Sequence, residues 1–179
     1  MKTRWILETV IAALIAAVYT ALTVAVAPLS YGLVQCRVSE ALTVLAAFTP
    51  AAVPGLTVGC FLSNLIGVST GATIAGALDL LLGPLATGLA ALLSYRLRRY
   101  RRGGVPWLST LPPILLNALI VGTELAFTSP VFTWQVLLTQ IALVGAGQLA
   151  ACLIGGALLA KAITGTGLER LIFNEGPYL

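Results

Sequence analysis

The sequence predicts an all-α integral membrane protein with six transmembrane helices and with both ends on the cytoplasmic side. Of its 179 residues, 59% are hydrophobic and only 9% are charged. Water-soluble domains carry roughly 25% charged residues, so this chain cannot cover a water-facing surface and its solvent must be largely lipid. Apolar stretches recur along residues 1–179, which we treat as a single transmembrane domain.

The first predicted helix covers about residues 6–27 and follows the basic start Met1-Lys2-Thr3-Arg4-Trp5. A cleaved signal peptide begins in the same way, but its apolar core is only about 7–15 residues long. Because this apolar run is longer and further apolar segments follow it, we interpret it as a retained helix.

Prolines divide the next apolar stretch, which contains Pro50 and Pro54. Proline lacks a backbone donor and clashes with the preceding helical turn. We therefore predict two short helices, about residues 39–49 and 55–68, with a re-entrant hairpin as the alternative. The remaining predicted helices, which have the ~20 apolar residues that a bilayer crossing requires, cover about residues 73–95, 109–127 and 134–163.

Basic residues determine the predicted orientation, because cytoplasmic loops are enriched in Lys and Arg. With an even number of spans, all the basic groups fall on one face of the membrane. These are Lys2 and Arg4, then Arg96, Arg98, Arg99, Arg101 and Arg102, and finally Lys161 and Arg170. The chain is thus expected in the cell membrane with both termini cytoplasmic. We interpret the arginine cluster as a topology determinant, and binding of a partner or of anionic lipid is the alternative.

Small residues repeat at helical spacing along the first predicted helix. The row consists of Ala13, Ala17, Ala21 and Ala25, with Ala12 and Ala16 beside it. Such rows permit close approach of two helices in a membrane. The row could pack inside this protein or against a partner subunit, and the sequence favours neither.

Polar side chains gather in the outer half of the predicted membrane, as judged from a rise of ~1.5 Å per helical residue. They are Arg37, Glu40, Asn64, Asp79, Asn117, Glu124, Gln135, Gln140 and Gln148. Charges inside a bilayer are costly and usually mark function. The segregation therefore predicts a solute pocket that opens to the outside.

Structural roles are the alternative for several of these residues. Arg37 and Glu40 could pair on one helix face. Asn64 and Asn117 could form hydrogen bonds between helices, and Asp79 could cap a helix start. Glu124 lies in an apolar helix with no basic residue nearby in sequence, so a purely structural role is least expected there.

The residue types favour a planar heterocycle with several donors as the ligand, since hydrogen bonds to ionised groups are the stronger ones. The chain has no histidine, and its cysteines, Cys36, Cys60 and Cys152, are scattered. That pattern argues against a thiolate metal site. Without an evident nucleophile–base pair, we expect neither an enzyme nor a cofactor, and no nucleic-acid partner.

Three separated motifs resemble the queuosine-precursor transporter (QueT) family. The first runs from Arg37-Val-Ser-Glu40-Ala-Leu through Thr49-Pro50-Ala-Ala-Val-Pro54-Gly55-Leu and Gly59-Cys60 to Asn64. The second is Asp79 with Gly83 and Leu85-Ala86-Thr87. The third comprises Pro112-Pro113, Asn117-Ala118, Val121-Gly122 and Glu124-Leu125. The motifs follow the family order and cover nearly the whole chain.

The resemblance implies a six-helix substrate-binding (S) subunit of an energy-coupling-factor (ECF) transporter that captures a 7-deazaguanine from outside. Such subunits dock on a coupling protein and two ATP-hydrolysing subunits. The family's usual docking surface would fall on Ala12, Ala13, Ala16 and Ala17. This chain has no Walker-type GxxxxGK[ST] run, which agrees with an energy source in a partner.

The expected substrate-binding residues are Arg37, Glu40, Asn64, Asp79, Asn117, Glu124, Gln140 and Gln148. One position departs from the family pattern, because a glutamate commonly follows Gly147 where this chain has Gln148. The exchange removes a negative charge. It leaves open whether the ligand is the cationic aminomethyl form, the neutral cyano form or queuine.

Two other interpretations keep the membrane fold. The cargo could be another vitamin, such as a flavin or a thiamine-like base. Alternatively, the chain could be a stand-alone secondary transporter, although such proteins tend to contain inverted repeats, and the sequence has no clear internal repeat.

Overall fold

The computed structural model describes residues 2–32 and 35–169, and all its regular elements there are helices. Five of these helical stretches are long and apolar enough to cross a membrane. They are Arg4–Ala25, Ala52–Ser69, Gly76–Arg96, Trp107–Thr128 and Trp134–Gly165. The chain is therefore a multi-pass membrane protein, as predicted.

The spanning stretches consist of the following elements. Helix α1 covers Lys2–Ala25, α3 covers Ala52–Ser69, and α4 covers Asp79–Arg96 after a 3₁₀ turn, η2, at Gly76–Leu78. Helix α5 covers Leu111–Thr128 after the 3₁₀ turn η3 at Trp107–Thr110. Helix α6 covers Trp134–Gln148 and continues through a π-helical segment, η4 (Leu149–Gly155), into α7 (Gly156–Gly165). A short helix, α2 (Ala27–Ser30), follows α1.

The second predicted helix differs most from expectation. Instead of an α-helix at 39–49, the chain forms a ten-residue 3₁₀ helix, η1 (Val38–Ala47), most of which is buried. A 3₁₀ helix rises ~2.0 Å per residue, so η1 covers only about 20 Å of a ~30 Å hydrocarbon layer. Packing against α1, α4, α7 and η4 encloses it. The six-span topology therefore stays a prediction.

Two helix starts also differ from those predicted. Helix α3 begins at Ala52, so Pro54 lies in its first turn. Backbone N–H groups in the first turn of a helix have no intrahelical acceptor, so the missing N–H of proline costs no hydrogen bond there. Helix α4 begins only at Asp79, after Gly76 adopts a positive φ of 68°. Asp79 thus lies at the helix start and not two turns inside it.

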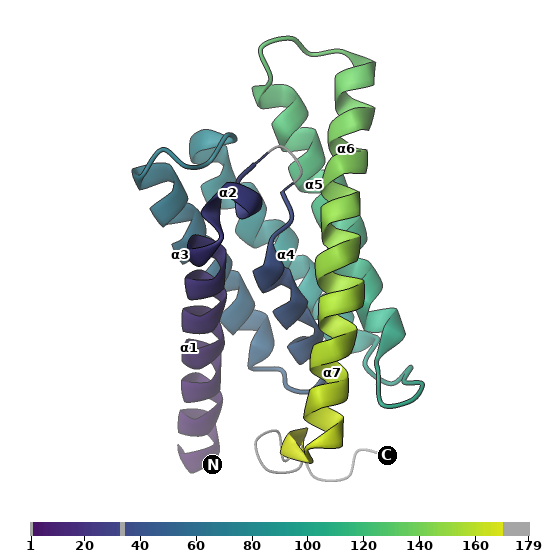
Figure 1. Ribbon diagram of the computed structural model, residues 1–179. Helices are drawn as coiled ribbons and strands as arrows, with labels where there is room; N and C mark the ends of the chain where they lie inside the picture. The colour runs from purple at the N-terminus through teal and green to yellow at the C-terminus, as the bar shows by residue number, and fades with distance from the viewer. Residues whose placement is uncertain (1, 33–34, 170–179) are drawn as a thin grey trace.

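Neighbouring helices pack in the order α1, α3, α4, α5 and α6, and η1 fills the centre (Figure 1). The start of α1 and the end of α7 lie at the same end of the bundle (Figure 1). The α4–α5 loop reaches this end too, since Arg101 bonds Glu169 at 2.6 Å and the Ala47 carbonyl at 2.9 Å. The basic residues of α1, of the α4–α5 loop and of α7 thus lie at one end, whereas Arg37 is buried in the bundle and Arg170 lies outside the described residues.

Two glycines of α3 allow α1 to pack closely against it. A Cβ atom on Gly55 would lie 2.7 Å from the Ala12 carbonyl oxygen, and one on Gly59 would lie 2.8 Å from Tyr19 Cβ. Ala16 is only 5% exposed at this contact. Part of the alanine row therefore packs inside the protein.

The other alanines expected at a docking surface are arranged differently. Ala13 and Ala17 are exposed on the side of α1 that α3 does not cover. Of the four alanines expected at the docking surface, Ala13 and Ala17 are thus exposed, Ala12 is partly buried and Ala16 is buried.

Replacing Gly59 by leucine should force α1 away from α3, because Tyr19 Cβ and the Ala16 backbone occupy the space. We expect the free energy of unfolding to fall by about 1–3 kcal/mol, the usual cost of overpacking. Thermal unfolding of the purified protein followed by tryptophan fluorescence would measure it. The matched control is Gly165→Leu, where an added Cβ meets nothing within 4 Å; equal effects of the two substitutions would contradict the packing argument.

Candidate functional site

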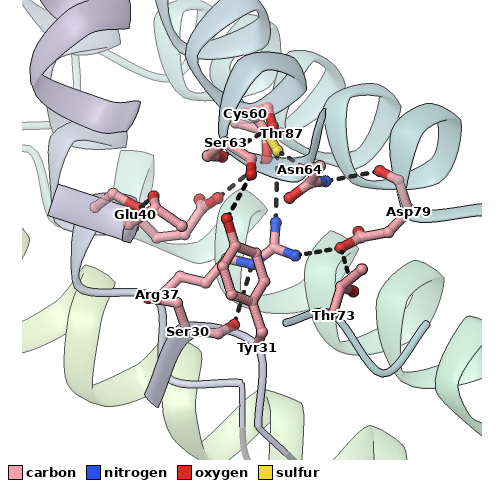
Figure 2. Close-up of polar contacts among 12 residues, drawn as sticks. Ser30, Tyr31, Arg37, Glu40, Cys60, Ser63, Asn64, Thr73, Asp79 and Thr87 are labelled. Carbon is pink, nitrogen blue, oxygen red and sulfur yellow. Dashed lines mark hydrogen bonds and ion pairs between the residues drawn. The ribbon is translucent and has the colours of Figure 1, made fainter. Parts of the chain in front are cut away.

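A buried guanidinium organises the centre of the bundle. Arg37 lies just before η1, is 3% exposed, and forms a 2.8 Å ion pair with Asp79 at the start of α4. Its other nitrogens donate to the Ser30 carbonyl at 3.4 Å and to Cys60 Sγ at 3.5 Å (Figure 2). Arg37 therefore links the segment after α2 with α3 and α4.

Asn64 of α3 also binds the start of α4. Its Nδ2 donates to the backbone carbonyl of Asp79 at 2.6 Å (Figure 2). Gly83, one turn into α4, leaves the room that both side chains need. Asp79 Oδ2 also accepts a 3.4 Å hydrogen bond from Thr73, whereas Oδ1 has no partner in the part of the chain that the structure describes. The geometry fits the interhelical role considered for Asn64.

Glu40 is held by helices on both sides of η1 and does not pair with Arg37. Its Oε1 accepts hydrogen bonds from the Tyr19 hydroxyl of α1 and from Thr87 Oγ1 of α4, the latter at 3.0 Å. Within the described residues its Oε2 accepts no hydrogen bond of good geometry, although Asn117 of α5 lies close enough to interact with the carboxylate. One oxygen of this buried carboxylate is therefore bound by α1 and α4, and the other faces Asn117.

Glu124 differs from Glu40 and Asp79 in having no hydrogen-bond partner for either oxygen within residues 2–32 and 35–169. Its side chain is buried in α5 with 2% exposure. Asp79 and Arg37 are close enough to influence it electrostatically. An ionised group in such a place is costly unless another molecule supplies its hydrogen bonds.

Glutamines from the last long helix complete the cluster. Gln148 is buried, and its Oε1 accepts a 3.3 Å hydrogen bond from Cys152, whose sulfur also approaches the Glu40 carbonyl at 3.5 Å. Gln140 is half-buried with an unpaired Oε1. The close contact between Gly122 and Ile141 places Gln140 at about the level of Glu124 along the two helices. Gln135, in contrast, is exposed.

Among the described residues, the unpaired buried atoms are mainly acceptors. Four are carboxylate oxygens: Glu40 Oε2, Asp79 Oδ1 and both oxygens of Glu124. Ionised carboxylates can only accept hydrogen bonds. Buried polar groups normally have partners, so this site is suited to a molecule that brings several N–H donors.

Tyr31, which directly follows α2, packs over the hydrogen-bond network of Arg37, Asp79 and Asn64. Its hydroxyl donates to the Ser63 carbonyl, its ring packs against Gly67, and the Arg37 guanidinium lies 5.7 Å from the ring centroid. Burial raises the pKa of the Tyr31 phenol above its usual range. The hydroxyl therefore stays a neutral donor that fixes the segment after α2 against α3.

Comparison with known families gives one match. The family model of the QueT transporter matches residues 9–165, from α1 to the end of α7. This chain belongs to the QueT transporter family. Neither the curated proteins nor the solved structures gave a match. The family assigns the chain a role in transport and not in catalysis, and the match includes every candidate site residue.

Two residues that hold Glu40 in this QueT protein were not among the expected site residues. Tyr19 is fully buried and looks from sequence like one more residue of an apolar helix. A tyrosine in such a helix still needs a partner for its hydroxyl, which was the available signal. Thr87 belongs to the second family motif, but nothing in the sequence indicates that it reaches Glu40.

Proposed function

We propose that this QueT family protein is the S subunit of an ECF transporter and that it captures a queuosine precursor from outside the cell. The observation that carries the proposal is the Glu124 carboxylate, which is buried and has no hydrogen-bond partner among the described residues. A guanine-like base presents a ring N–H beside an exocyclic amine, and two parallel donors match the two oxygens of a carboxylate.

The other side chains would complete recognition of the base. Glu40 Oε2 would accept a further donor, and Asn117 and Gln140 would satisfy the remaining ring atoms, since each has an unpaired polar atom. Arg37 would act indirectly by holding Asp79 in place, because its nitrogens already have protein partners. A wrong base would leave polar groups unpaired at a cost of about 1–3 kcal/mol each.

The balance of charge in the site favours a cationic ligand. Three carboxyl groups, those of Glu40, Asp79 and Glu124, share the site with a single guanidinium, that of Arg37, and a cation would stabilise their ionised forms. The aminomethyl form of the 7-deazaguanine carries the compensating positive charge, whereas the cyano form is neutral. We therefore place the aminomethyl form ahead of the neutral cyano form, even with Gln148 in place of a glutamate.

The proposed topology has six crossings with both termini in the cytoplasm. The turn at residues 35–37 and the buried 3₁₀ helix η1 would together form the second crossing. The basic groups at one end of the bundle support this orientation. The site would then open toward the outside. It would lie near the start of η1, whereas Arg101 lies near the end of η1.

A coupling protein and two ATP-hydrolysing subunits would supply the energy. The exposed side of α1 with Ala13 and Ala17 would meet the coupling protein, because small side chains permit close helix contact. Ala12 and Ala16 would contribute only by holding α1 against α3.

The proposal is tested by identifying the ligand of the purified protein. Native mass spectrometry should detect a co-purifying 7-deazaguanine, and calorimetric titration of the stripped protein should show tighter binding of the aminomethyl form than of the cyano form. Riboflavin and thiamine serve as competitors. Binding of either vitamin without binding of a deazaguanine would overturn the substrate. Uptake into vesicles that lack any ATPase subunit would overturn the ECF assignment.

A further inference from the structure

A hollow of about 690 Å³ lies between the end of α4 and the start of α5. Its lining consists of Arg99, Tyr100, Arg101, Arg102, Trp107 and Leu108. A tight turn shapes it, in which Arg102 and Val105 exchange backbone hydrogen bonds of 3.0 and 3.3 Å. The turn residues Gly103 and Gly104 have positive φ angles of 61° and 78°, which glycine adopts without strain. Backbone contacts therefore fix the turn that borders the hollow.

The three arginines of the hollow differ in their partners. Arg101 is engaged by Glu169 and by the Ala47 carbonyl, and its guanidinium lies 4.6 Å from the centre of the Phe48 ring. Arg99 and Arg102 are exposed, and neither has an acidic partner within residues 2–32 and 35–169. Two positive charges thus border the hollow without compensation from the described part of the chain.

Aromatic side chains place the hollow at the surface of the membrane. Tyr100 is 65% exposed and Trp107 is 42% exposed, and tryptophan and tyrosine are enriched at the membrane–water interface. Beside them, Leu93 of α4 and Leu111 of α5 expose apolar surface on helices that can span the membrane. A molecule in the hollow would therefore meet guanidinium groups at one end and apolar helix surface at the other.

We propose that this hollow binds the phosphate headgroup of an anionic phospholipid between Arg99 and Arg102, with the acyl chains along α4 and α5. The guanidinium fork matches phosphate oxygens in a bidentate manner. Basic residues next to a membrane helix attract anionic lipid. A free phosphate would satisfy the same charges but would leave the exposed Tyr100, Trp107 and Leu111 uncovered, which is why a lipid is the better fit.

Native mass spectrometry of the whole protein released from nanodiscs tests the site. The nanodiscs contain phosphatidylcholine with a minority of phosphatidylglycerol, and the readout is the number of each lipid retained. The wild type should retain phosphatidylglycerol preferentially, and the double variant Arg99→Gln with Arg102→Gln should reduce this retention about tenfold or more. The control variant, Arg96→Gln with Lys161→Gln, removes two charges at the same end of the bundle but outside the hollow, and it should keep the lipid.

Each other outcome overturns the inference. Equal loss in the control variant would show attraction by net charge alone and no site. Equal retention of phosphatidylcholine would remove the preference for anionic lipid. Displacement of phosphatidylglycerol by millimolar inorganic phosphate or glycerol phosphate would show a site for a free anion. Ligand binding at Glu124, measured in parallel, should be the same in both double variants, so the test is separate from that of the proposed transport role.

Discussion

Glu124→Gln is expected to weaken binding of the 7-deazaguanine by about 100-fold, because each hydrogen bond to a charged group contributes about 1.5–3 kcal/mol. The amide replaces one acceptor oxygen by an NH₂ group that would face the donors of the base. Equilibrium titration of the purified variant measures the loss. Glu8→Gln is the matched control, since Glu8 is partly exposed on α1 and pairs only with Arg4 among the described residues.

Glu40→Gln should have a smaller effect, of about tenfold, because the remaining carbonyl oxygen can still accept from Tyr19 and Thr87 and only one free acceptor is lost. The empty Glu124→Gln protein should unfold no more readily than the wild type, since the substitution removes an unpaired buried carboxylate. Unfolding data therefore separate a loss of binding from a loss of folding. Unchanged affinity in both variants would refute the site assignment.

The Arg37–Asp79 ion pair should dominate the stability of the centre of the bundle. Arg37→Met or Asp79→Leu alone leaves one charge buried without its partner, which typically costs about 3–5 kcal/mol. Both single variants should therefore unfold at clearly lower temperature. The double variant should recover most of the loss, because a buried ion pair can often be replaced by apolar side chains.

A double-mutant cycle on unfolding free energies measures this coupling directly. Additive effects of the two substitutions would show that the pair does not interact as the 2.8 Å contact indicates. Ligand titration of the double variant adds a second result. If Arg37 acts only by positioning, the folded double variant should still bind the base through Glu124.

The long helices could be predicted from sequence because lipid imposes a simple requirement on them. A continuous apolar run is needed wherever a helix faces hydrocarbon, and the ranges predicted for α1 and α5 differ from the observed ends by only a few residues. The helix η1 follows no such rule. Protein surrounds it on most sides, so packing against neighbours determines its 3₁₀ form and local composition does not reveal it.

The candidate site could likewise be predicted from the sequence only in part. The cost of burying Arg37, Glu40, Asp79 and Glu124 identifies them as special residues in any membrane sequence. Their pairing could not be predicted, because Arg37 and Asp79 are 42 positions apart and only the fold brings them together. The nearer candidate, Glu40, instead binds Tyr19 and Thr87. Which carboxylate is left unpaired is therefore a property of the three-dimensional structure.

The π-helical segment η4 determines the rotational phase between two halves of the last long helix. Each α-helical residue turns the chain by about 100°, and single π turns are typically found at functional sites. On the N-terminal side of η4 the helix carries Gln140 and Gln148. On its C-terminal side Ala157, Ala160 and Ile163 belong to the buried face. The wide turn lets both sets point inward along one continuous rod. In a regular α-helix, Gln148 and Ala157 would instead lie about 180° apart around the axis, because nine residues at about 100° each make two and a half turns.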